Sequence, residues 1–156
     1  MGARAWWRGQ SRRPFLTDVP PPLLNGCPVT PLDELRGPIY VGLTIEDEKA
    51  VVPITIDSIS QRLQENTAGA SFGFYVCDFA TSELGLAHQR DFERMCPHPI
   101  PVTEETSVEL GSQQLVVSVT AARTGVVRMQ GADVTYARGW QHGTETFGPE
   151  LRLDVR

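Results

Sequence analysis

Residues 115–137 read LVVSVTAARTGVVRMQGADVTYA, and this stretch decides the fold class. Leu115–Thr120 and Val126–Gln130 are short runs rich in valine, which fits the pleated, half-buried surface of a sheet. Arg123-Thr124-Gly125 lies between them and predicts a hairpin turn. Gly131 separates the second run from another alternating run, which predicts a β-bulge that bends one long strand. We therefore expect antiparallel β structure.

Similar short runs precede this stretch. Ile39–Ile45 and Val51–Ile56 flank the polar tip Glu46-Asp47-Glu48-Lys49, so we expect these two runs to pair as a hairpin. Phe72–Phe79 is apolar at successive positions, which predicts a central core strand covered on both faces. Residues 58–66 fit either a further strand or one helical turn. The chain closes with strand-like runs at Ser107–Leu110, Val134–Ala137 and Leu151–Val155.

Two regions depart from this pattern. Apolar residues recur at near-helical spacing within residues 81–95, behind Thr81 and Ser82 as caps, which predicts one short helical insertion. Residues 1–36 contain six prolines and show no periodicity, which indicates a disordered or extended, proline-rich lead. The remaining residues, 37–156, are expected to form a single β-sandwich domain.

An antiparallel, immunoglobulin-like β-sandwich of about seven strands suits this spacing, because no strand alternates with a long amphipathic helix. Residues 120–136, with Gly139, Gly143 and Gly148 beyond them, resemble the closing strands of immunoglobulin-like domains from bacterial cell-envelope proteins of actinobacterial type. Val52–Ile59 resembles an earlier strand of such domains. The resemblance implies an all-β sandwich that acts by interaction at a cell envelope.

Charge and hydropathy exclude two classes of partner. The formal net charge is −5 and the pI is near 5.2, which opposes the electrostatic footprint needed to bind a phosphate backbone, so we expect no nucleic-acid partner. No apolar run is long enough to cross a bilayer, so no membrane span is expected in this chain. The first thirteen residues are basic through Arg4, Arg8, Arg12 and Arg13, whereas the rest of the chain is acidic overall.

Two export-like patterns lie in the lead. Residues 11–16 resemble a twin-arginine motif, and Leu24-Asn25-Gly26-Cys27 resembles a lipoprotein cleavage box. The segment between them carries Pro20-Pro21-Pro22 and cannot form the apolar helix that an export signal requires. The resemblance to envelope domains favours an extracytoplasmic, envelope location. Because the export signal is incomplete, a cytoplasmic location stays open.

The three cysteines fit no zinc or redox motif. Cys27 and Cys96 each precede a proline in a loop-like context, where a disulfide could clamp the lead onto the domain in an oxidising compartment. Cys77 lies in an apolar run, where it would be a small buried hydrophobic residue.

Catalysis is not indicated, and we expect no enzyme, no cofactor and no metal. The chain lacks nucleophile-elbow, phosphate-loop, dinucleotide-binding and zinc-protease motifs. The alternative is a small enzyme or metal-binding protein that uses His88, Cys96 and His98. Two prolines around His98 are explained more simply by a rigid loop.

The candidate binding residues gather near the last hairpin. Tyr136, Trp140, His142 and Phe147 could form a recognition patch, since loops at sandwich ends often carry binding residues. The alternative is that Trp140 packs over the end of the sandwich.

These observations favour a non-catalytic interaction or structural module with an unidentified protein partner. The alternative is a small cytoplasmic assembly component that docks through its N-terminal arm. Nothing in the sequence indicates the oligomeric state.

Overall fold

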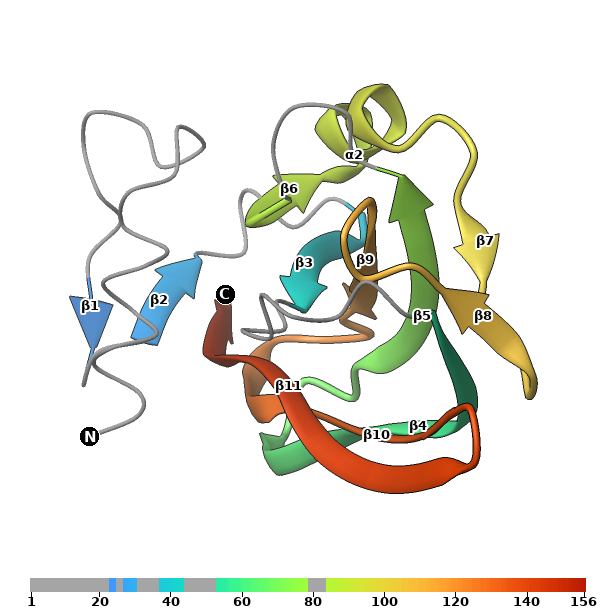
Figure 1. Ribbon diagram of the computed structural model, residues 1–156. Helices are drawn as coiled ribbons and strands as arrows, with labels where there is room; N and C mark the ends of the chain where they lie inside the picture. The colour runs from blue at the N-terminus through green and yellow to red at the C-terminus, as the bar shows by residue number, and fades with distance from the viewer. Residues whose placement is uncertain (1–22, 25–26, 31–36, 44–52, 79–83) are drawn as a thin grey trace.

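The computed structural model describes residues 23–24, 27–30, 37–43, 53–78 and 84–156. These residues form two β-sheets and one short helix, which confirms the expected mostly antiparallel, all-β architecture. In Figure 1, the helix α2 (Gln89–Met95) lies at the top, and the long strands β4 (Ile54–Asn66), β10 (Gly125–Arg138) and β11 (Gln141–Val155) lie at the bottom.

The first sheet, here sheet I, is built around three long antiparallel strands. In spatial order it contains β1 (Leu23–Leu24), β2 (Cys27–Thr30), β11 (Gln141–Val155), β10 (Gly125–Arg138), β4 (Ile54–Asn66) and β8 (Thr106–Val108). Residues 58–66 therefore belong to a strand and not to a helical turn. The β2–β11 pair is parallel and joins Val29 and Thr30 to Arg152 and Leu153.

The second sheet, sheet II, is fully antiparallel. In spatial order it contains β6 (Leu86–His88), β3 (Ile39–Leu43), β9 (Gln113–Thr120), β5 (Ser71–Asp78) and β7 (Ile100–Pro101). The helix α2 (Gln89–Met95) packs on its outer face through Phe92. The main core lies between the sheets, where alternate residues of the facing strands are buried, among them Ile39, Val41, Ile54, Leu115, Val117, Met129, Val134 and Leu151.

The Phe72–Phe79 run was expected to be a central strand covered on both faces, and this is confirmed in part: β5 is an inner strand with Val76 in the main core and Cys77 under α2, but the middle strand of sheet II is β9. Leu115, Val117 and Val119 face the main core, while Val116 is buried on the opposite side under α2. In β5 only Val76 and Cys77 are buried. The reason is position: β9 lies between β3 and β5, whereas β5 lies next to the two-residue edge strand β7.

Two expected hairpins are instead connections between sheets. Ile39–Leu43 lies in sheet II and Ile54–Asn66 in sheet I, so the runs predicted to pair with each other do not pair. β9 and β10 are also in different sheets. The Ala122 and Arg123 amides donate hydrogen bonds to the Ala68 carbonyl, each at 3.1 Å, and these bonds fix the arch between the sheets.

The predicted bulge at Gly131 is confirmed. The β10–β11 register shifts between Gln130 and Ala132, and Gly131 has a φ of +72°. A Cβ atom at this position would collide with the Phe147 carbonyl oxygen. Glycine is therefore required for the bend in β10, which lets this strand stay paired with β11 on both sides of the bulge.

The insertion is only partly helical, so the expected helix over residues 81–95 is corrected to Gln89–Met95. Residues 79–83, with the proposed caps Thr81 and Ser82, lie outside the described residues. Leu86–His88 is a strand because its backbone pairs with β3.

Within the lead, which is expected to be disordered or extended, the described residues form the short strands β1 and β2. The rest of residues 1–36 lies outside the described residues. The helical part of the described structure contains no segment long and apolar enough to cross a membrane.

Candidate functional site

The β10–β11 hairpin ends in a two-residue loop. Arg138 pairs with Gln141, which leaves Gly139 and Trp140 as the central residues. Gly139 has a φ of +59° and is followed by a residue of negative φ, the arrangement of a type II′ turn that suits the twist of paired strands. This turn presents Trp140 with 86% of its surface exposed. Trp140 therefore does not pack over the sandwich end, which was the alternative to recognition.

An aromatic pair supports the hairpin below its tip. The rings of Tyr136 and Phe147 stack at a centroid distance of 6.3 Å and an interplanar angle of 25°. Phe147 is buried in the main core, and the Tyr136 hydroxyl donates a 2.7 Å hydrogen bond to Glu145. Gly143 lies opposite Tyr136 on β11, where a Cβ would make an ordinary van der Waals contact with the ring at 3.4 Å. The base of the hairpin is thus anchored to the core.

Polar side chains join the three long strands on one face of sheet I. Thr146 of β11 donates to Asp133 of β10 at 2.6 Å and accepts from Arg62 of β4 at 3.2 Å. Thr135 and Thr144 are hydrogen-bonded at 2.9 Å. These bonds stiffen the sheet beneath the hairpin tip without burying charge.

His142 lies on the same hairpin but does not join an aromatic patch. Its Nδ1 atom is 3.6 Å from a carboxylate oxygen of Asp57 on β4, which makes an ion pair when the imidazole is protonated. The four predicted binding residues therefore have separate roles. Trp140 is exposed at the tip, Tyr136 and Phe147 form the base, and His142 faces β4.

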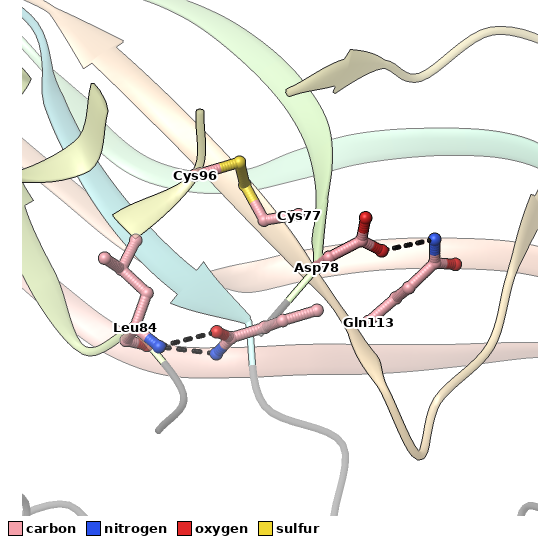
Figure 2. Close-up of a disulfide and its surroundings, with 6 residues drawn as sticks. Cys77, Asp78, Leu84, Cys96 and Gln113 are labelled. Atoms are coloured by element: carbon pink, nitrogen blue, oxygen red, sulfur yellow. Dashed lines mark hydrogen bonds between the residues drawn. A yellow bond between two sulfur atoms is a disulfide. The ribbon is translucent and has the colours of Figure 1, made fainter. Parts of the chain in front are cut away.

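A disulfide joins Cys77 at the end of β5 to Cys96 directly after α2 (Figure 2), with Cα atoms 5.5 Å apart. Because a sulfur atom forms only one disulfide, the expected Cys27–Cys96 bridge is corrected to Cys77–Cys96. Cys77 is buried, as predicted, but it is a bonded half-cystine and not a free thiol. The sequence signal that was missed is that these two cysteines bracket the insertion that packs on β5.

Gln114 is a buried polar residue next to this disulfide that the sequence reasoning overlooked. Its Oε1 accepts a 2.7 Å hydrogen bond from the Leu84 amide, and its Nε2 donates a 3.0 Å bond to the Leu84 carbonyl (Figure 2). Gly42 of β3 leaves room for this contact, because a Cβ atom there would collide with both the Leu84 carbonyl oxygen and the Gln114 amide. The neighbouring Gln113 instead donates to Asp78 at the surface, at 2.9 Å.

An aromatic cluster lies under α2. Phe92 stacks on Tyr40 at a centroid distance of 3.7 Å, and Tyr75 lies within 6.4 Å of Tyr40. Burial raises the pKa of the Tyr40 phenol, and negative charge on Tyr75 and on Glu93 would raise this pKa further. The cluster is apolar packing with a phenol that stays protonated at neutral pH.

The three residues of the enzyme or metal alternative have different surroundings in the described structure. Cys96 is disulfide-bonded, so it offers neither a nucleophilic thiolate nor a metal ligand. His88 is the N-cap residue of α2, and His98 lies exposed in the proline-rich segment that follows. In the part of the chain that the structure describes, no three His, Cys, Asp or Glu side chains come together as a metal site.

Comparisons with protein-family models, with curated proteins and with solved structures found no match to this chain.

Proposed function

We propose that this chain is a non-catalytic, immunoglobulin-like β-sandwich module of a bacterial cell envelope, and that it binds a protein partner through the tip of the β10–β11 hairpin. The observation that carries the proposal is the 86% exposure of Trp140 on a hairpin whose base is anchored in the core.

Trp140 has the properties of a binding anchor. Its large apolar surface lies in water when the protein is alone, so burying it against a partner is favourable. The tight turn and the anchored base reduce the conformational entropy that binding would otherwise cost. Tryptophan is also among the residues that most often dominate interface energies.

The edge of β11 supports a protein as the partner. Between Gln141 and Thr146 this strand pairs with β10 on one side, and no described strand pairs with its other side. Alternate backbone amides and carbonyls along such an edge are available to an added strand. A partner that contacts Trp140 could therefore extend sheet I with its own backbone.

The fold and the compartment of the proposal have separate support. The chain changes sheets repeatedly, because β4, β8 and β10 lie in sheet I while β3, β5 and β9 lie in sheet II, and such changes are typical of two-sheet sandwiches with Greek-key connections. The Cys77–Cys96 disulfide favours an oxidising compartment, because such bonds are rare among cytosolic proteins.

Site-specific photo-cross-linking tests the binding site. A benzophenone amino acid is placed at position 141 of the full chain and irradiated in the cells that produce the protein. We expect one discrete protein adduct that falls about tenfold or more when Trp140→Ala is added, since truncating an anchor of this kind weakens binding strongly.

Leu63→Ala is the matched control, because Leu63 is an exposed apolar residue of β4 outside the hairpin. This variant should leave the adduct unchanged. The proposal is wrong if no adduct forms, or if both substitutions reduce the adduct equally.

A further inference from the structure

We propose that docking of α2 on the outer face of sheet II depends on the Cys77–Cys96 disulfide, so that the helix is held in place only where these two cysteines are oxidised. This inference concerns the opposite side of the molecule from the β10–β11 hairpin (Figure 1) and does not rest on the proposed function.

The helix α2 is too short to be stable without its attachments. It contains seven residues, and isolated helices shorter than about 12 residues are marginal in water. The Asp91–Arg94 ion pair is exposed, and pairs of this kind contribute little to helix stability.

Non-covalent packing of α2 depends mainly on one side chain. Phe92 is the buried residue of the helix, and it stacks on Tyr40 of β3. Met95 is only partly buried against the same cluster. The disulfide attaches the C-terminal end of the helix, since Cys96 directly follows α2. The Cys96 amide also caps the helix by donating a 2.7 Å hydrogen bond to the Phe92 carbonyl.

The strand before the helix is held independently of the disulfide. β6 pairs with β3, the Gly42 amide donates to the Gly85 carbonyl at 2.8 Å, and Gln114 binds both backbone groups of Leu84. In Figure 2 these Leu84 bonds lie beside the disulfide but do not involve it. Loss of the disulfide should therefore release α2 while β6 stays paired.

The chemistry is thiol–disulfide exchange. The thiols of Cys77 and Cys96 lose two protons and two electrons as the S–S bond forms, and a disulfide-bearing oxidant accepts them and becomes a dithiol. The two cysteines are 19 residues apart. Closing a loop of that size should raise the ratio of docked to undocked α2 roughly a hundredfold relative to the reduced chain.

Release of α2 would uncover an apolar face. Val116 is fully buried on the outer side of β9, in the cluster that Phe92 completes, and Tyr40 packs beside it. Before oxidation, the chain would therefore present these side chains to solvent or to other proteins.

Hydrogen–deuterium exchange with mass spectrometry tests this inference on the full chain carrying Cys27→Ser, which removes the third thiol. Exchange is compared before and after reduction with a phosphine under native conditions. We expect the amides of residues 92–96, which donate to carbonyls within α2, to exchange about a hundredfold faster after reduction, while those of residues 113–120 keep their protection.

Two results would overturn the proposal. Equal protection of α2 in both states would mean that packing alone docks the helix, and simultaneous loss of protection in α2 and β9 would mean that the disulfide holds the whole sandwich. If the buried disulfide resists the reductant, Cys77→Ser with Cys96→Ser gives the same comparison, and the same two results overturn the proposal there.

Discussion

Gln114 shows how one side chain can replace a missing strand partner. A carboxamide carries both a donor and an acceptor, so it can satisfy the amide and the carbonyl of Leu84 as a neighbouring strand would. Leu84 is itself buried, so water cannot easily take over these bonds. The polar side chain is therefore a structural requirement of the insertion.

Gln114→Met keeps the volume of the side chain but removes both hydrogen bonds. Because the two backbone groups of Leu84 would be left buried without partners, we expect the free energy of unfolding to fall by about 3 kcal/mol. Gln113→Met is the matched control, and its loss of one surface bond should cost about 0.5 kcal/mol or less. Urea denaturation measures both, and equal losses would contradict the assigned role of Gln114.

At the scale of single elements, the bulge in β10 determines the shape of sheet I. Gly131→Ala would force a side chain into a left-handed conformation and against the Phe147 carbonyl, so we expect a loss of about 2 kcal/mol or more. Gly111→Ala is the control, because a Cβ there meets nothing within 4 Å. Thermal unfolding compares the two, and a neutral Gly131→Ala would show that the bulge tolerates a side chain.

Local pattern predicted the elements better than it predicted their partners. Gly131 between two alternating runs was sufficient to predict the bulge, which the register shift between Gln130 and Ala132 confirms. The sheet that each strand joins depends on long-range contacts, such as the Ala68 carbonyl that fixes the β9–β10 arch. Local pattern therefore could not distinguish an arch between sheets from a hairpin.

The candidate site shows the same limit. The sequence placed Trp140 on a hairpin, but its exposure follows from the length of β10 and β11 beyond the anchored Tyr136–Phe147 pair. Cys96 could be recognised as a disulfide candidate from its loop context. Its partner could not, because the choice of Cys77 depends on α2 folding back over β5.

At the scale of the whole molecule, the two ends of the sandwich differ in kind. One side carries the hairpin with exposed Trp140, and the other carries a helix attached by a disulfide (Figure 1). The sheets are joined by backbone arches and a shared apolar core that does not include the disulfide cluster. Binding at the hairpin and oxidation at the helix are therefore expected to be separable properties of one domain.

The oxidation state of the protein in its native host tests the proposed compartment. The chain has three cysteines, of which Cys77 and Cys96 are bonded, so a thiol-alkylating reagent should label only Cys27 before reduction and all three cysteines after it. Intact mass measured on protein alkylated at the moment of lysis distinguishes these forms. Because the cytoplasm keeps most protein thiols reduced, three labels without reduction would contradict an envelope location and favour the cytoplasmic assembly component. A species with the two bonded cysteines protected would instead show that the chain meets an oxidant before it is isolated, as a module at the cell envelope must.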